Sequence, residues 1–218
     1  MSSFAESYIA SITRLLGEVP AGAKMDENEI AAAEASLGMK LPAALREYYL
    51  PAGRLDQLNL AHNRLATLRE LRVHNGKVVF CEENQGAVIW GMDMSRSAAD
   101  DPPVYQSPGP EYTEWHAELI PRCSTFLTVM LHLQAVFGGL PCIAYAKEFE
   151  RQKLIDGLRD WTLIHADAEI EVLAAQGAAI IIVGSDENQE LHAGAAREEQ
   201  LEALERESLL RWEWLEGD

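Results

Sequence analysis

Residues 78–91 read Val78-Val79-Phe80-Cys81-Glu82-Glu83-Asn84-Gln85-Gly86-Ala87-Val88-Ile89-Trp90-Gly91, and residues 100–105 read Asp100-Asp101-Pro102-Pro103-Val104-Tyr105. Two apolar runs joined by a polar segment that ends in glycine are typical of antiparallel strands that meet at a turn. The two prolines predict a stiff entry into a third strand, because proline restricts the backbone. These segments contain nothing that resembles a catalytic motif, which favours a binding protein over an enzyme.

Three helices are predicted before this region, because apolar residues recur there at helical spacing. Asp26 and Glu29 have the spacing of a capping box, in which the Asp side chain accepts from early backbone N–H groups and the Glu side chain reaches back. Leu41-Pro42 is expected to begin a helix, since proline is tolerated at the first helical position. The expected helices cover residues 4–16, 26–38 and 41–53.

Short apolar runs separated by turn residues predict a sheet around residues 78–91 and further strands after it. The segment 125–137 is apolar almost all round and is expected to form a helix packed across this sheet. The strands expected in the first part cover residues 65–71, 77–82, 87–92, 104–106 and 113–116. The later part is expected to contain helices at 147–157 and 196–212 and strands at 161–165, 169–174, 178–183 and 191–193.

These elements predict an α+β fold, in which N-terminal helices pack on a mostly antiparallel twisted sheet and a C-terminal α/β extension follows. A chain of 218 residues suits one domain with an appendage. We expect residues 1–150 to form the α+β domain. Residues 151–218 are expected to form a strand-and-helix extension packed on the same domain.

The chain carries 35 acidic and 18 basic residues, which gives a net charge of -17. Such a surface repels the phosphates of nucleic acids and of anionic membranes, so neither is expected as a partner. Its field would speed the encounter with a basic protein. The acidity also suits a protein that needs it for solubility alone, and the sequence leaves both interpretations open.

Cysteine, histidine and glycine patterns indicate neither a metal nor a cofactor. Cys81, Cys123 and Cys142 lack metal-ligand spacing and cannot all pair, so we expect small buried residues in a reducing compartment. The six histidines form no HxH or HExxH pattern, and neither G-x-G-x-x-G nor a P-loop occurs.

The first residues lack the pattern of a signal peptide, and no apolar stretch is long enough to span a bilayer, which predicts a cytoplasmic protein.

A series of short motifs follows in a definite order between residues 25 and 140. It consists of Glu29-Ile30, Glu34, Leu37-Gly38, Leu41-Pro42, Leu45, Tyr48-Tyr49, Gly53, Glu83-Asn84-Gln85-Gly86, Trp90-Gly91, Asp101-Pro102-Pro103-Val104, Trp115 and Phe126-Leu127. In this order the motifs resemble the SUKH superfamily. Its many bacterial members are thought to be immunity proteins against polymorphic toxins, and its fungal members are linked to cell-wall regulation.

The resemblance implies a fold more firmly than a function, since one scaffold can serve different partners. It implies a non-catalytic immunity protein that binds a cognate toxin domain, such as a nuclease, and blocks its active site. The alternative is a regulatory scaffold similar to the fungal members, which binds several partners. An enzyme that uses the acidic loops is a third hypothesis, but the sequence does not show the separated pKa values or the cleft that paired carboxylates need.

Candidate contact residues lie at the turn, in the next connection and after it. An acidic rim would meet Lys or Arg on a partner, and aromatic residues would supply buried contact area. The polar turn residues are equally consistent with turn chemistry alone. The candidates are Glu82, Glu83, Asn84, Gln85, Asp100, Asp101, Tyr105, Tyr112 and Trp115.

A second group of residues is expected to hold the fold. Trp90 is expected in the core with its indole N–H bonded to a backbone carbonyl, although it also suits a binding face. The other members of this group are Leu41, Pro42, Gly91, Pro102, Pro103, Phe126 and Leu127. Near the C-terminus, Trp212 and Trp214 flanked by acids suit either a helix lying on the body or an exposed recognition hook.

Overall fold

The structure is a computed structural model that describes residues 3–93, 95, 99–184 and 188–217. The chain forms two compact units, each made of two segments. The first unit is Met1–Ala10 with Val19–Thr128, and the second is Ser11–Glu18 with Val129–Asp218. The division between the units therefore comes earlier than residue 150, where the sequence suggested a change.

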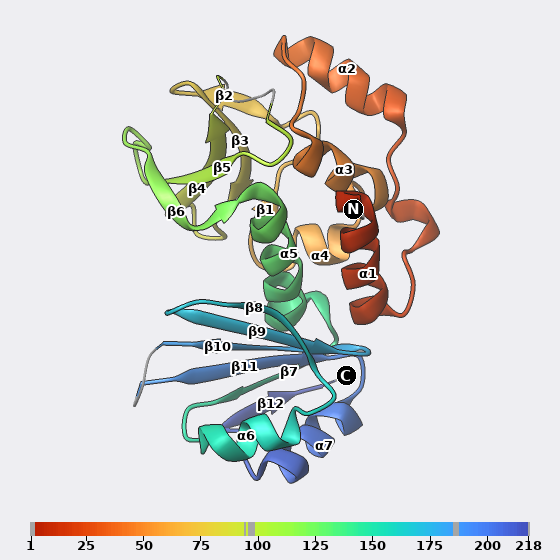
Figure 1. Cartoon of the computed structure of the whole chain (residues 1–218), viewed down its shortest axis with the longest axis vertical. Helices are drawn as coiled ribbons and strands as arrows, with labels where there is room; N and C mark the ends of the chain where they lie inside the picture. The colour runs from red at the N-terminus through yellow and green to blue at the C-terminus, as the bar shows by residue number, and fades with distance from the viewer. Residues whose placement is uncertain (1–2, 94, 96–98, 185–187, 218) are drawn as a thin grey trace. The chain divides into compact units, whose positions relative to one another are not determined.

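The N-terminal helices begin and end close to their predicted positions (Figure 1). Asp26 and Glu29 form the predicted capping box, and Gly38 ends that helix with a positive φ of 69°. The helices are α1 (Phe4–Leu16), the 3₁₀ turn η1 (Ala21–Ala23), α2 (Glu27–Leu37), α3 (Ala43–Ala52) and the short α4 (Asp56–Asn59). Leu41 and Pro42 are both buried, and Pro42 is the N-cap residue of α3.

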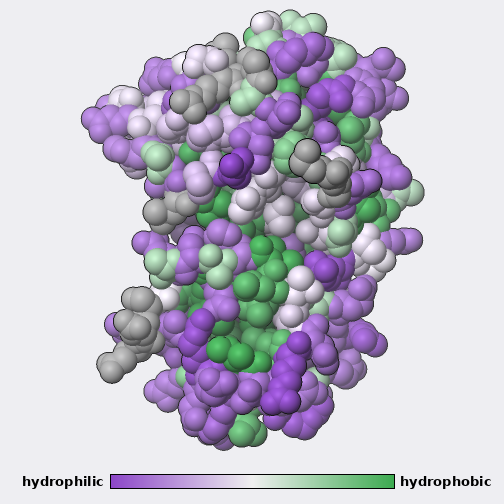
Figure 2. Space-filling model, viewed as in Figure 1, coloured by the Kyte–Doolittle hydropathy of each residue, from purple (hydrophilic) through white to green (hydrophobic). Residues whose placement is uncertain are grey.

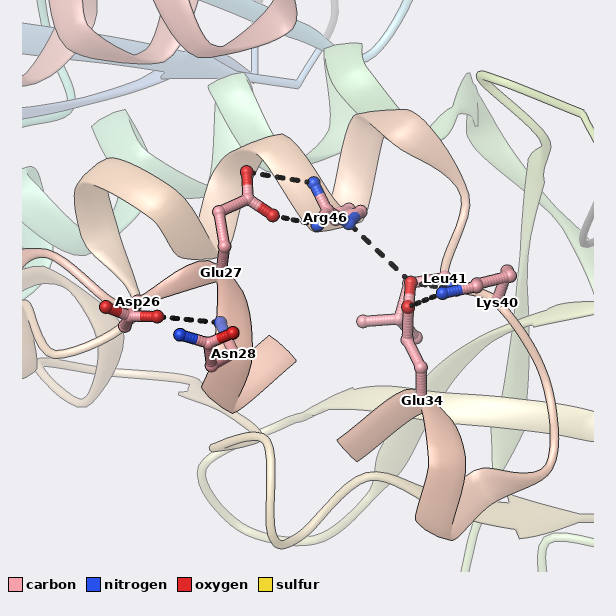
Figure 3. Close-up of polar contacts among 7 residues, drawn as sticks. All are labelled: Asp26, Glu27, Asn28, Glu34, Lys40, Leu41 and Arg46. Carbon is pink, nitrogen blue, oxygen red and sulfur yellow. Dashed lines mark hydrogen bonds and ion pairs between the residues drawn. The ribbon is translucent and has the colours of Figure 1, made fainter. Parts of the chain in front are cut away.

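A buried carboxylate fastens α2 to the start of α3 (Figure 3). Glu34 is 3% exposed and accepts hydrogen bonds from Leu41 N at 3.0 Å and from Lys40 Nζ at 2.7 Å. Arg46 Nε lies 3.7 Å from the same carboxylate, and its guanidinium also pairs with Glu27 near the start of α2. Because a buried charge needs compensating donors, Glu34 links the two helices only while this set of donors stays in place.

The first sheet lies in the first unit and is antiparallel throughout its described pairings. Its order is β1-β3-β4-β5-β6, and β2 also pairs with β3. The strands are β1 (Arg64–Leu65), β2 (Arg72–His74), β3 (Lys77–Glu82), β4 (Val88–Asp93), β5 (Pro103–Pro108) and β6 (His116–Arg122). Between Val79 and Cys81 the register with β4 shifts by one residue, so the bulge changes which side chains of β3 share a face.

Helix α5 (Cys123–Gln134) begins in the first unit, where it packs on this sheet as the sequence predicts. The Phe126 ring lies 5.6 Å from the ring of Phe80 and 5.7 Å from that of Trp90, measured between centroids. Leu127 is 1% exposed, so both members of the predicted Phe126-Leu127 pair belong to the core. The helix continues as the π-helical turn η3 (Ala135–Gly139).

The second unit contains its own antiparallel sheet, with the order β12-β7-β11-β10-β9-β8. Its strands are β7 (Cys142–Ala146), β8 (Thr162–Ala166), β9 (Ile170–Ala175), β10 (Ala178–Val183), β11 (Glu190–Ala195) and β12 (Trp214–Glu216). Helices α6 (Arg151–Gly157) and α7 (Glu198–Ser208) pack together on this sheet (Figure 1). Leu154, Leu201 and Leu204 from these helices share a core with Ile180 and Ile182 of β10.

One edge of the second sheet is irregular. Among the described strands, β8 pairs only with β9, and the register shifts between Leu163 and His165, which leaves Ile164 as the extra residue of a bulge. Bulges are common at sheet edges because they twist the strand and interrupt its row of hydrogen-bonding groups. Leu163 is 56% exposed on this edge.

The surface is mixed in polarity. Figure 2 shows hydrophilic side chains over most of one face and apolar side chains gathered over the strands of the second sheet. In the part of the chain that the structure describes, no helix combines the length and the apolar character needed to cross a membrane. The fold is α+β, as the sequence predicts.

Candidate functional site

The turn between β3 and β4 is closed by one of the candidate carboxylates. Glu83 accepts hydrogen bonds from the backbone N–H groups of Gln85 at 2.9 Å and Ala87 at 3.0 Å. The backbone N–H of Asn84 donates to Asn63 Oδ1 at 3.3 Å, which ties the turn to the segment before β1. Glu83 and Asn84 therefore shape the turn, whereas the side chain of Gln85 is exposed.

Glu82 lies at the end of β3 beside two arginines. It pairs with Arg72 of β2, and Arg64 Nη1 of β1 lies 3.9 Å from its Oε2 atom. These pairs connect the three strands that meet at this edge of the first sheet. Because both partners are basic, Glu82 adds little negative potential to the surface around it.

Asp100 and Asp101 are adjacent in sequence but differ in their surroundings. Asp101 accepts from the backbone N–H of Ser124 at 2.8 Å and from its hydroxyl at 2.7 Å, so it caps the start of α5. The side chain of Asp101 is 13% exposed, and Arg122 Nη1 lies 3.8 Å away. Asp100 is exposed, and its backbone carbonyl accepts from Ala44 N at the start of α3. Asp100 is thus the carboxylate of this pair that is open to a partner.

Two of the predicted aromatic residues, Tyr105 and Trp115, lie around a lysine on the first sheet. Lys77 Nζ lies 3.9 Å from the centroid of the Tyr105 ring and 5.8 Å from that of Trp115. These distances are within the range of cation–π attraction. Lys77 also pairs with Asp93 of β4 at 3.5 Å, and Asp93 has a lowered pKa because it accepts hydrogen bonds from the hydroxyl and backbone N–H of Ser95.

Tyr112 connects three segments of the first unit. Its hydroxyl donates to the carbonyl of Gly86, and its own carbonyl accepts from His74 Nε2 at 2.8 Å and from Asn75 Nδ2 at 3.3 Å. The His74 ring also makes edge contacts with Tyr112 and Trp115, each at 6.4 Å between centroids. Residues His74, Lys77, Tyr105, Tyr112 and Trp115 are called the aromatic face below.

Trp115 closes over a position where only glycine fits. A Cβ atom on Gly91 would lie 2.9 Å from the Trp115 ring, so the ring would have to shift, and 3.0 Å from the carbonyl of Val78, which is tighter than ordinary van der Waals contact. Gly91 therefore lets the indole lie directly on the sheet. The indole N–H of Trp115 is buried and has no hydrogen-bond acceptor among the described residues, which costs about 1–3 kcal/mol for such a donor.

Trp90 belongs to the other side of β4, where it contacts Phe126. Its indole N–H donates to Glu118 Oε2 of β6 at 2.7 Å, so the acceptor is a carboxylate rather than the expected backbone carbonyl. Pro102 is buried and Pro103 begins β5, which agrees with the predicted stiff entry into that strand. Trp90 and the prolines thus contribute to packing and strand pairing.

Sequence reasoning found the three aromatic residues of the face but missed Lys77 and His74. The available signal was a lysine at the start of an otherwise apolar strand; its position opposite Asp93 follows from the register of β3 and β4 in the structure. The aromatic face can bind a partner by aromatic contact area, by cation–π attraction and by hydrogen bonding.

The buried thiols of Cys81 and Cys123 have raised pKa values because burial disfavours the thiolate, which makes them poor nucleophiles.

Across residues 3–93, 95, 99–184 and 188–217, no group of three or more His, Cys, Asp or Glu side chains is arranged to hold a metal ion. Comparison of the chain with protein-family models, with curated proteins and with solved structures gave no match.

Proposed function

We propose that this chain is a cytoplasmic, non-catalytic immunity protein of the SUKH type. It binds a basic toxin domain, for example a nuclease, and blocks the active site of that domain. The observation that carries the proposal is the aromatic face, in which Tyr105 and Trp115 lie around Lys77 while Tyr112 and Trp115 both contact the His74 ring. Tyrosine and tryptophan are the residues most often found as anchors at protein interfaces.

The surroundings of the aromatic face suit a basic partner. Glu111 and Glu114 flank Tyr112 in sequence and are both exposed, Glu114 with 79% of its side chain accessible. Together with Asp100 they are better placed to meet a partner than Glu82 or Asp101, which already bind within the protein. The net charge of -17 would steer a basic domain toward the protein before these contacts form.

The order of motifs between residues 25 and 140 supports the proposed family. The Glu34, Leu37-Gly38 and Leu41-Pro42 motifs meet at the junction of α2 and α3, where Glu34 binds the backbone of Leu41. Each motif thus has a physical role in one local structure. The agreement between the motif order and these local contacts supports a SUKH-type fold. The basic partner is proposed separately, from the aromatic face and the exposed carboxylates around it.

The direct test is co-expression with the toxin domain encoded by an adjacent reading frame. We expect rescue of growth and a stoichiometric complex. Trp115→Ala should weaken binding at least about tenfold, since interface anchors contribute about 2 kcal/mol or more. Trp214→Ala is the matched control, because Trp214 is 47% exposed but lies in the second unit, and it should change affinity less than about twofold.

A charge variant avoids the risk that Trp115→Ala affects folding. Glu114→Arg reverses an exposed charge beside the aromatic face and should slow association, with a larger effect at low salt. Absence of both binding and growth rescue would refute the proposal. Capture of several endogenous proteins without rescue would instead favour the regulatory scaffold.

A further inference from the structure

A large groove lies within the second unit, apart from the aromatic face. Its volume is about 1270 Å³, and three chain segments form its walls. These are 147–151, which run from the end of β7 into α6, 167–171, which run from the β8–β9 turn into β9, and 209–213 between α7 and β12 (Figure 1). The volume exceeds the roughly 300–1,000 Å³ of most small-molecule sites, which suits a peptide segment better.

The floor of the groove contains apolar side chains held by the core. Phe149 and Trp212 are half-buried and pack against the core of the second unit, and Ile182 belongs to that core. Trp212 is fixed at two points, because its indole N–H donates to the carbonyl of Leu201 at 3.2 Å and its backbone N–H to Glu205 at 3.3 Å. A rigid apolar floor can receive a bulky side chain at little entropic cost.

The walls carry mainly negative charge. Basic side chains of the lining are largely paired, since Arg151 binds Glu171 and Lys147 lies 3.4 Å from Glu190 outside the groove. Glu148, Glu169 and Glu213 are exposed and form no ion pair within the described residues. Among the described residues, the lining contains seven acidic and three basic side chains.

An exposed, strained leucine stands at the same groove. Leu209 follows α7 with φ 51° and ψ 29°, a left-handed conformation that L-residues rarely adopt. Glycine ends helices in this conformation without strain, yet here a leucine occupies the position with 70% of its surface exposed. Strained residues are retained where they have a function, and an exposed leucine that lines a groove is suited to contact a partner.

We propose that this groove binds a short segment of another protein in which arginine or lysine alternates with bulky apolar residues. The apolar side chains contact Leu209, Trp212 and the floor, and the basic side chains pair with Glu148, Glu169 and Glu213. Charge complementarity identifies the occupant, because the unpaired lining groups are mostly carboxylates. The proposal does not depend on the aromatic face, so it goes beyond the function proposed above.

Three labelled nonapeptides and the full chain test the proposal by fluorescence anisotropy. In the first peptide arginine alternates with leucine, in the second glutamate replaces arginine, and in the third glycine replaces leucine. We expect the first to bind, the second to show no measurable binding, and the third to bind at least tenfold more weakly. Equal binding of the first and third peptides, or no binding of the first at millimolar concentration, overturns the proposal.

Variants locate the binding. Glu169→Arg and Glu213→Arg should each weaken the binding of the first peptide at least fivefold. Glu202→Arg makes the same change in charge at an exposed position of α7 that does not line the groove, and should change affinity less than twofold. An equal loss in all three variants would show attraction by net charge alone and would overturn the proposal.

Leu209→Gly separates binding from folding. This variant removes the strained side chain, so the melting temperature should stay the same or rise while peptide affinity falls at least threefold. Unchanged affinity would overturn the assigned contact. Trp115→Ala should leave peptide binding unchanged, so failure of the groove and failure of the aromatic face give different results.

Discussion

Glu34→Ala should be among the most destabilising single changes in the first unit. The carboxylate is 3% exposed, and its removal leaves the backbone N–H of Leu41 buried without an acceptor. An unsatisfied buried donor costs about 1–3 kcal/mol. The pair with Lys40, whose side chain is 80% exposed, adds at most about 1 kcal/mol. The expected loss in the free energy of unfolding is therefore about 1–4 kcal/mol.

Urea unfolding followed by circular dichroism measures this loss, and amide hydrogen exchange at Leu41 locates it. Glu27→Ala is the matched control, because Glu27 pairs with Arg46 at the surface and its side chain is 58% exposed. That control should lose less than about 1 kcal/mol. If both variants lose the same free energy to within about 0.5 kcal/mol, the reasoning about the buried donor fails.

Three further predictions concern other parts of the protein. Asp101→Ala removes both acceptors of Ser124 and should lower the free energy of unfolding by about 1–3 kcal/mol, measured by urea titration against the exposed neighbour Asp100→Ala. Gly91→Ala should cost about 1–3 kcal/mol in the same assay, because the added methyl group meets Trp115; a neutral result would contradict the close packing. Burial lowers the pKa of His192, so this imidazole binds more protons in the unfolded chain than in the folded one. The stability it contributes is therefore present above its usual pKa of about 6.5 and is lost as the pH falls through the lowered value. Thermal melts between pH 8 and 5 measure this loss of stability, which should be smaller in His192→Gln.

Local features of the fold were predictable wherever a few neighbouring residues determine the backbone. Asp26 and Glu29 define the start of α2 and Gly38 its end, because capping depends on groups within one turn. The turn at residues 84–86 follows from polar residues and a glycine with φ 71°. In these places the residues that form the sequence pattern are the same ones that determine the backbone conformation.

Predictions failed where long-range pairing determines the structure. Strand β7 was missed although Ile143 and Tyr145 favour strands, because Cys142, Ala144 and Ala146, which alternate with them, do not; the strand forms by pairing with β11 and β12. The strand expected at 65–71 stops at Leu65, because Glu70 accepts from the backbone and hydroxyl of Thr67 and closes a turn. Local propensity was therefore a poor guide in both segments.

The candidate site was predictable in part for a related reason. Tyr105, Tyr112 and Trp115 stand out by residue type, but the approach of Tyr105 and Trp115 to Lys77 depends on the register of the strands. Asp101 caps a helix that starts more than twenty residues later, so its structural role has no local signal. A carboxylate on a loop cannot be assigned to surface or scaffold until its donors are known.

The bulge at Ile164 has a consequence for handling the protein at high concentration. An unbroken strand with an exposed leucine at this edge would offer a template for pairing with the same edge of another copy. The bulge makes two such edges poor matches. Deleting Ile164 would restore a regular ladder, and light scattering of that variant should reveal assemblies that grow with concentration and time.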